Sequence, residues 1–242
     1  MKKIIVALAF AFNAVSAFSQ EIIRISPDVE LMKLSENAYV HVSYTDSHDF
    51  GRYSSNGLVF INGHEAFLFD TPPGDSLTGI LCSYLEQDMN LIIRAFVPNH
   101  WHEDCMGGLR YIKGRHIPSY ANQNTIDIAR SHRLPLPEHG FVDSLNLMLG
   151  GKSVLCWFPG AAHSMDNIVV WIPSEKILFA GCMCKSANSD NLGNVADGDP
   201  AEYAATIEKV IAKFSSVKIV IPGHGLPGGP ELLSHTRTIA KR

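Results

Sequence analysis

One short segment gathers side chains of the types that bind transition metals. His100, His102 and Asp104 stand two residues apart, directly after an apolar run that ends at Val97. In an extended segment, residues two apart point to the same side, so we expect these three side chains to project together. Neutral imidazole and carboxylate are ordinary ligands of zinc. Because the chain has 11 histidines and some close pairs arise by chance, this spacing alone does not establish a metal site.

Three further candidate ligands each follow an apolar run that ends in proline or glycine. They are His163 after LCWFPG, Cys182 after ILFAG and His224 after IVIPG. Functional sites of α/β sheets gather at the carboxyl ends of strands, so all six side chains converge if these strands share a sheet edge. Any one of these histidines alone would more often be structural, and the repeated context is what predicts a site.

The number of candidate ligands indicates two ions. Six protein ligands are too many for one tetrahedral zinc and too few to saturate two. Two ions about 3.5–4 Å apart match the count, and open coordination positions are typical of catalytic zinc. Water on such an ion reaches a pKa near 7, which supplies an attacking hydroxide at neutral pH. The residues therefore predict a two-zinc hydrolytic centre.

Hydrophobic periodicity indicates the elements that must position these ligands. Helical spacing predicts helices over 76–86, 107–113, 124–132, 201–214 and 230–240. Alternating or continuous apolar runs predict strands over 39–44, 57–61, 66–69, 91–97, 154–158, 168–172, 176–179 and 218–221. The two kinds of element interleave without a linker, which favours one α/β domain with helices on both sides of the sheet structure.

Composition excludes several classes of protein. The 242 residues are 46% hydrophobic and 18% charged, with 20 Lys+Arg against 24 Asp+Glu. This excludes a disordered polar chain and a polybasic nucleic-acid binder. We therefore expect no nucleic-acid partner.

The N-terminus has the pattern of a secretory signal peptide. Lys2 and Lys3 precede the apolar run 4–12 and small residues up to Ser19. The run is too short to span a bilayer, and a buried N-terminal helix is the weaker alternative. We expect cleavage after Ala17 or Ser19, so that residues 1–19 are the signal and 20–242 the functional domain. The product would be exported, periplasmic, free of the membrane and monomeric, with 18 basic and 24 acidic residues.

The cysteine count bears on the site because an exported chain meets an oxidising compartment. Five cysteines argue against a pure disulfide framework and for at least one thiol with another role. Cys82 and Cys156 lie in apolar runs and are expected in the core. For Cys184, a buried small side chain is favoured over a ligand, although its proximity to Cys182 raises the question of local oxidation.

Together, these motifs give a specific resemblance. The chain resembles the zinc metallo-β-lactamases of the first subclass of class B, of the Bacteroides type, over nearly all of its expected mature length. The matching motifs, in order, are SNG (55–57), LFDTP (68–72), NHWHEDCMGG (99–108), YANQ (120–123), PEHGF (137–141), HSMDNIVVWIP (163–173), LFAGCM (178–183), LGN (192–194) and PGHG (222–225). The resemblance implies an αββα sandwich with two zinc ions at one edge of the sheets.

The resemblance also implies roles for individual residues. It implies one zinc on His100, His102 and His163, and a second on Asp104, Cys182 and His224. Two positions support the subclass: a histidine at His100 argues against the mono-zinc subclass, and Cys105 with Cys182 argues against the glyoxalase-like branch.

The implied reaction is hydrolysis of the β-lactam amide of penicillins, cephalosporins and carbapenems, which confers antibiotic resistance. Asp104 would orient the hydroxide and handle its proton, and Asn194 would polarise the lactam carbonyl. Lys185 would pair with the substrate carboxylate. Phe50 would lie in a flap over the site where relatives often carry tryptophan, although segment 45–53 also fits an ordinary hairpin connection.

Other functions remain open because a fold does not fix a reaction. A thioesterase, lactonase or phosphodiesterase of the same superfamily would keep the fold and metals, but Lys185, Asn194 and the signal peptide argue against it. A non-enzymatic zinc-binding protein would need a closed ligand shell. An exported redox protein that uses Cys182 and Cys184 lacks the Cys-x-x-Cys motif.

Overall fold

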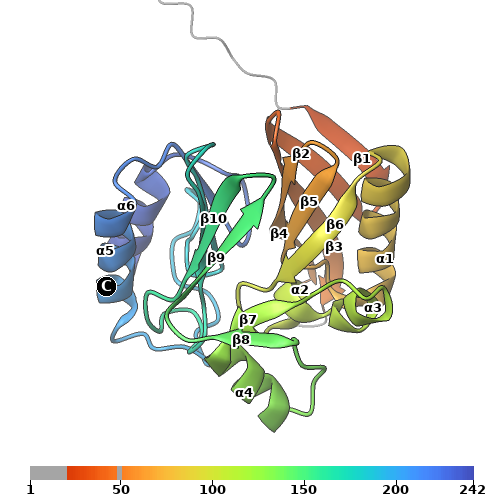
Figure 1. The fold of residues 1–242 in the computed structure, drawn as a ribbon. Coiled ribbons are helices and arrows are strands. Elements are labelled where there is room, and N and C mark those ends of the chain that lie inside the picture. Colours follow the sequence, from red (N-terminus) through yellow and green to blue (C-terminus); the bar gives the residue numbers. More distant parts are fainter. Residues whose placement is uncertain (1–20, 48–50) are drawn as a thin grey trace, which may run out of the picture.

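A computed structural model describes residues 21–47 and 51–242, which form two facing β-sheets (Figure 1). The first sheet has six strands in the order β1-β2-β3-β4-β5-β6, antiparallel except for the parallel pair β5–β6. Its strands are β1 (Ile22–Ser26), β2 (Val29–Ser35), β3 (Ala38–Ser47), β4 (Gly51–Asn62), β5 (Glu65–Phe69) and β6 (Ile92–Val97).

The second sheet has five strands in the order β13-β12-β11-β10-β9, and only β12 and β13 are parallel. Its strands are β9 (Ser144–Leu149), β10 (Lys152–Trp157), β11 (Val169–Ile172), β12 (Ile177–Gly181) and β13 (Ile219–Pro222). A separate parallel pair joins β7 (Tyr120–Asn122) to β8 (His139–Phe141).

Helices cover the outer faces of both sheets (Figure 1). Those beside the first sheet are α1 (Gly74–Ser83), which continues as the π-helical turn η1 (Tyr84–Asp88), and α3 (Leu109–Gly114). Those beside the second sheet are α5 (Tyr203–Lys213) and α6 (Glu231–Ile239), while α4 (Gln123–Ser131) lies next to β7 and β8. This arrangement confirms the expected αββα sandwich.

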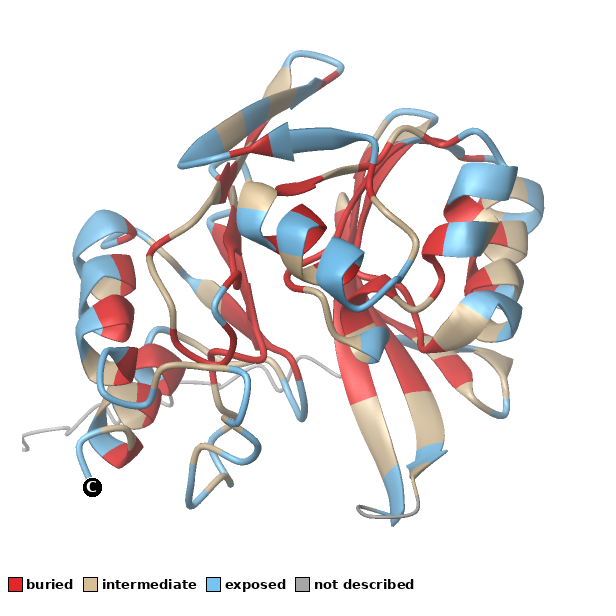
Figure 2. Ribbon diagram, turned by 90° about the horizontal axis from the view of Figure 1, so that it is seen from below, coloured by how far each residue is buried: buried red, intermediate tan, exposed pale blue. Residues whose placement is uncertain are grey.

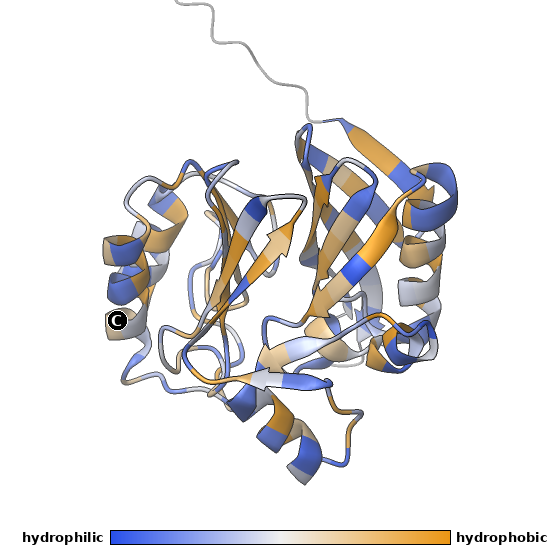
Figure 3. Cartoon of the chain, viewed as in Figure 1, coloured by the Kyte–Doolittle hydropathy of each residue, from blue (hydrophilic) through white to orange (hydrophobic). Residues whose placement is uncertain are grey.

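Successive side chains of a strand point to opposite faces of its sheet, and this explains how the central strands contribute to more than one apolar layer. Phe67 and Phe69 of β5 pack between the two sheets, whereas Leu68 packs toward α1 and α3. A third cluster lies between the second sheet and the helices α5 and α6. Because both faces of the central strands are buried, their sequences read as continuous apolar runs (Figures 2 and 3).

The structure confirms the five predicted helices and eight predicted strands, with bounds within a few residues except for β4, which begins at Gly51 and not at Gly57. It also adds elements that were not predicted. These are β1, β2, β7, β8, β9 and the short helix α2 (Glu103–Met106). The extended conformation expected through residue 104 is wrong, because residues 99–102 are bends and α2 then begins at Glu103. The expectation that the strands before the candidate ligands share one sheet edge is also wrong, since β6 belongs to one sheet and β10, β12 and β13 to the other.

Two expectations fall on residues outside the described part of the chain: the signal peptide 1–19 and the flap residue Phe50. Within the part that the structure describes, no helix combines the length and apolarity needed to cross a membrane.

Candidate metal centre

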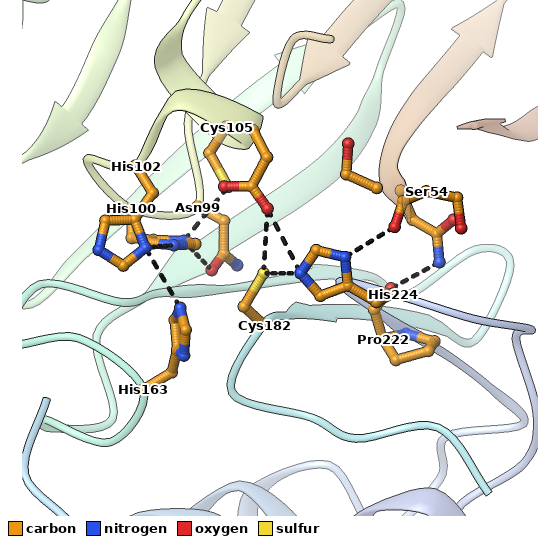
Figure 4. Close-up of polar contacts among 12 residues, drawn as sticks. Ser54, Asn99, His100, His102, Cys105, His163, Cys182, Pro222 and His224 are labelled. Atoms are coloured by element: carbon orange, nitrogen blue, oxygen red, sulfur yellow. Dashed lines mark hydrogen bonds and ion pairs between the residues drawn. The ribbon is translucent and has the colours of Figure 1, made fainter. Parts of the chain in front are cut away.

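His100, His102 and His163 direct ring nitrogens toward one another (Figure 4). His102 Nδ1 lies 2.9 Å from His100 Nε2 and 3.3 Å from His163 Nε2. The three donor atoms all lie within 4.8 Å of one another. Such a convergence of imidazoles is a ready three-nitrogen donor set for a transition metal.

A second donor set stands beside the first and combines sulfur, oxygen and nitrogen. Cys182 Sγ lies 3.6 Å from Asp104 Oδ2 and 3.4 Å from His224 Nε2. His224 Nε2 lies 3.4 Å from the same carboxylate oxygen. The structure thus brings together all six side chains that the sequence singled out as metal ligands.

The ends of strands from both sheets position these groups. β6 of the first sheet leads into the bends that carry His100 and His102, and the first turn of α2 carries Asp104. Cys182 and His224 follow the parallel neighbours β12 and β13. The chain turns from β12 into Cys182 at Gly181, which has a φ of 58°.

Gly181 is required there for two reasons. Its positive φ favours glycine, and a Cβ at this position would lie 2.4 Å from the side chain of Asn99. Asn99 in turn ties the two sheets together, because its backbone N–H donates to Asp70 and its Nδ2 donates to the carbonyl of Ile168. Asp70 is itself buried and its backbone lies in the left-handed region, so it acts here as a turn residue that accepts the hydrogen bond from Asn99.

Contacts on the far side of two histidines fix which nitrogen faces the centre. His224 Nδ1 donates to the carbonyl of Ser54 at 2.7 Å, which directs Nε2 toward Cys182 and Asp104. His102 Nε2 lies 3.0 Å from Asp197 Oδ2, which leaves Nδ1 facing the other histidines. A carboxylate or carbonyl behind the ring is the usual support of a metal-binding histidine.

The surroundings of His100 and His163 favour neutral imidazoles. Burial lowers the pKa of His100 well below its ordinary value, and burial lowers the pKa of His163 to about 3. Neighbouring positive charges act in the same direction. A neutral ring is the form that donates a lone pair to a metal, so these two rings are ready for a cation at neutral pH.

The second set concentrates negative charge. Burial and the charge of Cys182 raise the pKa of Asp104 to about 6, while a hydrogen bond from Cys105 lowers the pKa of the Cys182 thiol well below its ordinary value. Burial alone would lower the pKa of His224, but the Cys182 thiolate and Asp104 outweigh it and raise that pKa to about 10. A metal ion at this set would displace the His224 proton.

Comparison with known proteins identifies the family. The sequence profile of the metallo-beta-lactamase superfamily matches residues 50–224. The chain is 42% identical to a type 2 metallo-beta-lactamase of Bacteroides fragilis, over 100% of this chain and 97% of the relative. The chain belongs to the metallo-beta-lactamase superfamily.

Solved structures agree with this assignment. A metallo-beta-lactamase from Pontibacter korlensis superposes with a TM-score of 0.85 at 31% identity, covering 88% of this chain and 99% of that one. The metallo-beta-lactamase FIM-1 from Pseudomonas aeruginosa, solved in a mono-zinc form, gives a TM-score of 0.84 at 28% identity, covering 90% and 97%. The family resemblance and the fold expected from the sequence are therefore confirmed.

The residues expected to contact substrate differ in where the structure places them. Lys185 and His224 line a cavity of about 300 Å³ together with Ser186, Ser189 and Asp190. Asn194, by contrast, is exposed and does not line this cavity, and its Oδ1 accepts a hydrogen bond from Ala196 N at 3.1 Å. His224, one of the candidate metal ligands, and Lys185 thus line the same cavity, whereas Asn194 does not.

Sequence reasoning did not anticipate two residues of this metallo-beta-lactamase centre. Asp197 lies 95 positions after His102 in a turn-rich segment, and no local pattern identifies it as the partner of a histidine. The sulfur of Cys105, which the sequence does not place among the six candidate ligands, lies 3.2 Å from His100 Nδ1. A thiol next to Asp104 was a signal that could have placed it among the candidate donors.

Proposed function

We propose that this protein is a zinc-dependent β-lactamase that hydrolyses the amide bond of penicillins, cephalosporins and carbapenems and so confers resistance to them. The observation that carries the proposal is the juxtaposition of two metal-donor sets with the cavity that Lys185 and His224 line. Its named relatives are metallo-beta-lactamases, which supports the same reaction here.

The donor chemistry fits two zinc ions per chain. His100, His102 and His163 would hold one ion, and Asp104, Cys182 and His224 the other. These sets offer imidazole, carboxylate and thiolate, which are the ligands zinc prefers. Zinc bound there would lower the pKa of water to near 7 and withdraw electron density from the lactam carbonyl.

The chain's own residues would orient the reactants. The Lys185 ammonium, at the wall of the cavity, would bind the substrate carboxylate as a point charge. A carboxylate oxygen of Asp104 would accept a proton from the attacking water. The Nδ2 group of Asn194 would donate to the developing oxyanion, and this group is distinct from the Oδ1 atom that Ala196 N engages.

The remaining expectations concern context. We propose export to the periplasm by the signal peptide 1–19, a monomeric state and no membrane or nucleic-acid partner. Phe50, in the proposed flap, would cover less apolar substrate surface than a tryptophan, so Phe50→Trp should change the Michaelis constants of several β-lactams.

The experiment that separates this function from others of the superfamily is a substrate panel. Purified protein loaded with zinc is assayed against a penicillin, a cephalosporin, a carbapenem, a thioester, a lactone and a phosphodiester. We expect ring opening of the β-lactams and negligible turnover of the others. Turnover confined to the thioester, lactone or phosphodiester would contradict the proposal.

A further inference from the structure

The five cysteines, all within the described residues and all free, fall into two groups. Cys156, Cys82 and Cys184 each belong to one of the three hydrophobic clusters, where a thiol acts as a small apolar side chain. Cys105 and Cys182 are just as buried, at 1% and 2% exposure, but belong to none of these clusters. Their surroundings are polar donor atoms instead.

The contacts of Cys105 are those of a potential metal ligand. Its sulfur lies 3.2 Å from His100 Nδ1 and 3.9 Å from Asp104 Oδ1. One donor atom each from His100, Asp104, Cys105 and Cys182 lies within 4.8 Å of the other three. The two sulfurs are therefore close enough to bind a single ion.

This four-residue set overlaps the proposed zinc set of Asp104, Cys182 and His224. The two sets differ in the number of soft thiolate ligands that they offer. Both sets contain Asp104 and Cys182. The zinc set adds His224, whose side chain is 44% exposed, whereas the four-residue set adds His100 and a second, buried sulfur. Thiolate ligands favour soft metal ions, so a change from one sulfur to two changes which ion the site prefers.

We propose that Cys105 and Cys182 together bind a soft, thiophilic metal ion such as Cd²⁺, as a two-sulfur site that replaces the one-sulfur zinc set of Asp104, Cys182 and His224. The Cys105 thiol proton leaves to solvent as its sulfur–metal bond forms, and Asp104 contributes an oxygen. Both sulfurs are buried, and neither cysteine lines the cavity that Lys185 and His224 share. Soft ions would therefore bind in competition with zinc.

Cadmium gives a direct readout because each thiolate bound to Cd²⁺ adds a charge-transfer absorbance in the ultraviolet. Purified protein is dialysed against Cd²⁺ in place of zinc, for the wild type and for three serine variants. We expect Cys105→Ser and Cys182→Ser each to lower this absorbance to about half, because each removes one of two sulfurs. Cys184→Ser is the matched control, since Cys184 is equally buried but packs in an apolar cluster, and it should match the wild type.

A second measurement needs no variant. The cadmium-113 NMR resonance of the wild type should fall in the range of ions with two thiolate ligands. A resonance in the one-thiolate range, or a Cys105→Ser variant with undiminished charge-transfer absorbance, would overturn the proposal. Neither measurement uses a β-lactam, so the result is independent of whether the proposed hydrolysis is correct.

Discussion

The carboxylate of Asp197 lies behind the ring of His102, with 3.0 Å between Oδ2 and Nε2. This contact directs Nδ1 of His102 toward His100 and His163. Asp197 thus acts on the three-histidine set through another residue, as a positioning group rather than a ligand. Such partners fix the tautomer of a histidine ligand and raise its basicity.

Replacement of this positioning group should weaken metal binding. We expect Asp197→Asn to lower zinc affinity of the three-histidine set by about 10- to 100-fold, because the amide is a poorer acceptor than the carboxylate. Competition with a chromophoric chelator measures the affinity. The exposed Asp143→Asn is the control and should bind zinc as the wild type does. Equal affinities of Asp197→Asn and the wild type would exclude the positioning role.

Helix α6 supports the proposed substrate lysine. The backbone N–H of Lys185 donates to Thr236 Oγ1 at 2.8 Å, and that hydroxyl donates to the Leu232 carbonyl. We expect Thr236→Val, which keeps the shape but removes the acceptor, to raise KM for a β-lactam by about 3- to 10-fold, equivalent to about 1 kcal/mol of lost hydrogen bonding. The kcat value should change much less.

A substrate with an esterified carboxylate provides the control for this effect, because it cannot pair with Lys185. Wild type and Thr236→Val should hydrolyse the ester with similar KM values. If the variant raised KM for the ester as much as for the free acid, Thr236 would act on the site in general and not through the lysine.

Gly57 of β4 packs directly on His41 of the paired strand β3. A Cβ at Gly57 would lie 1.9 Å from His41 Nε2 and 2.6 Å from the Phe69 carbonyl, so both the ring and the backbone would have to move. We expect Gly57→Ala to lower the free energy of unfolding by about 1–3 kcal/mol. Gly114→Ala, where no atom lies within 4 Å of the added Cβ, should change it by less than about 0.5 kcal/mol. Urea unfolding of both variants measures the difference, and equal stabilities would contradict the packing argument.

His41 should also make stability depend on pH. Its Nε2 donates to the carbonyls of Phe69 and Asp70, and burial lowers its pKa from 6.5 to about 4. Between these pH values the unfolded chain binds a proton that the folded chain does not. The neutral His41 ring therefore contributes fully to the free energy of unfolding above pH 6.5. As the pH falls toward 4, this contribution is lost, which lowers the free energy of unfolding by up to about 3 kcal/mol.

Comparison with His41→Gln isolates this contribution from that of other groups, such as Asp70. Under the same metal-free conditions, the free energy of unfolding of the wild type should fall by about 2–3 kcal/mol more than that of the variant between about pH 7 and about pH 4.5. If both proteins lost the same free energy of unfolding over this pH range, His41 would have the same pKa in the folded and the unfolded chain, and the argument would be wrong.

The convergence of the candidate ligands at strand ends could be predicted from sequence, because proline or glycine ends each apolar run shortly before His163, Cys182 and His224. Strand β9 also carried a usable signal, since its alternating residues 144–149 have the period of a half-buried strand, whereas three-residue strands such as β7 are too short to show any period. Residue type and spacing identify Asp104 as a candidate ligand. The direction of its side chain depends on α2, a single helical turn that is too short for periodicity to detect.

The features that could not be predicted from sequence depend on contacts between segments that are distant in the chain or that turn sharply. The pairing of His102 with Asp197 and the approach of Cys105 to His100 arise from how distant or turning segments pack. The division of the strands between two sheets has the same origin, because a buried strand reads alike in either sheet.

The most direct test of the two-zinc hydrolytic centre is a zinc titration of chelator-treated protein, with carbapenem hydrolysis followed by absorbance at each addition. We predict that chelation abolishes turnover and that activity returns and levels off at about two equivalents of zinc per chain. Full turnover in the chelated protein, or no turnover from protein that holds two zinc ions, would contradict this account.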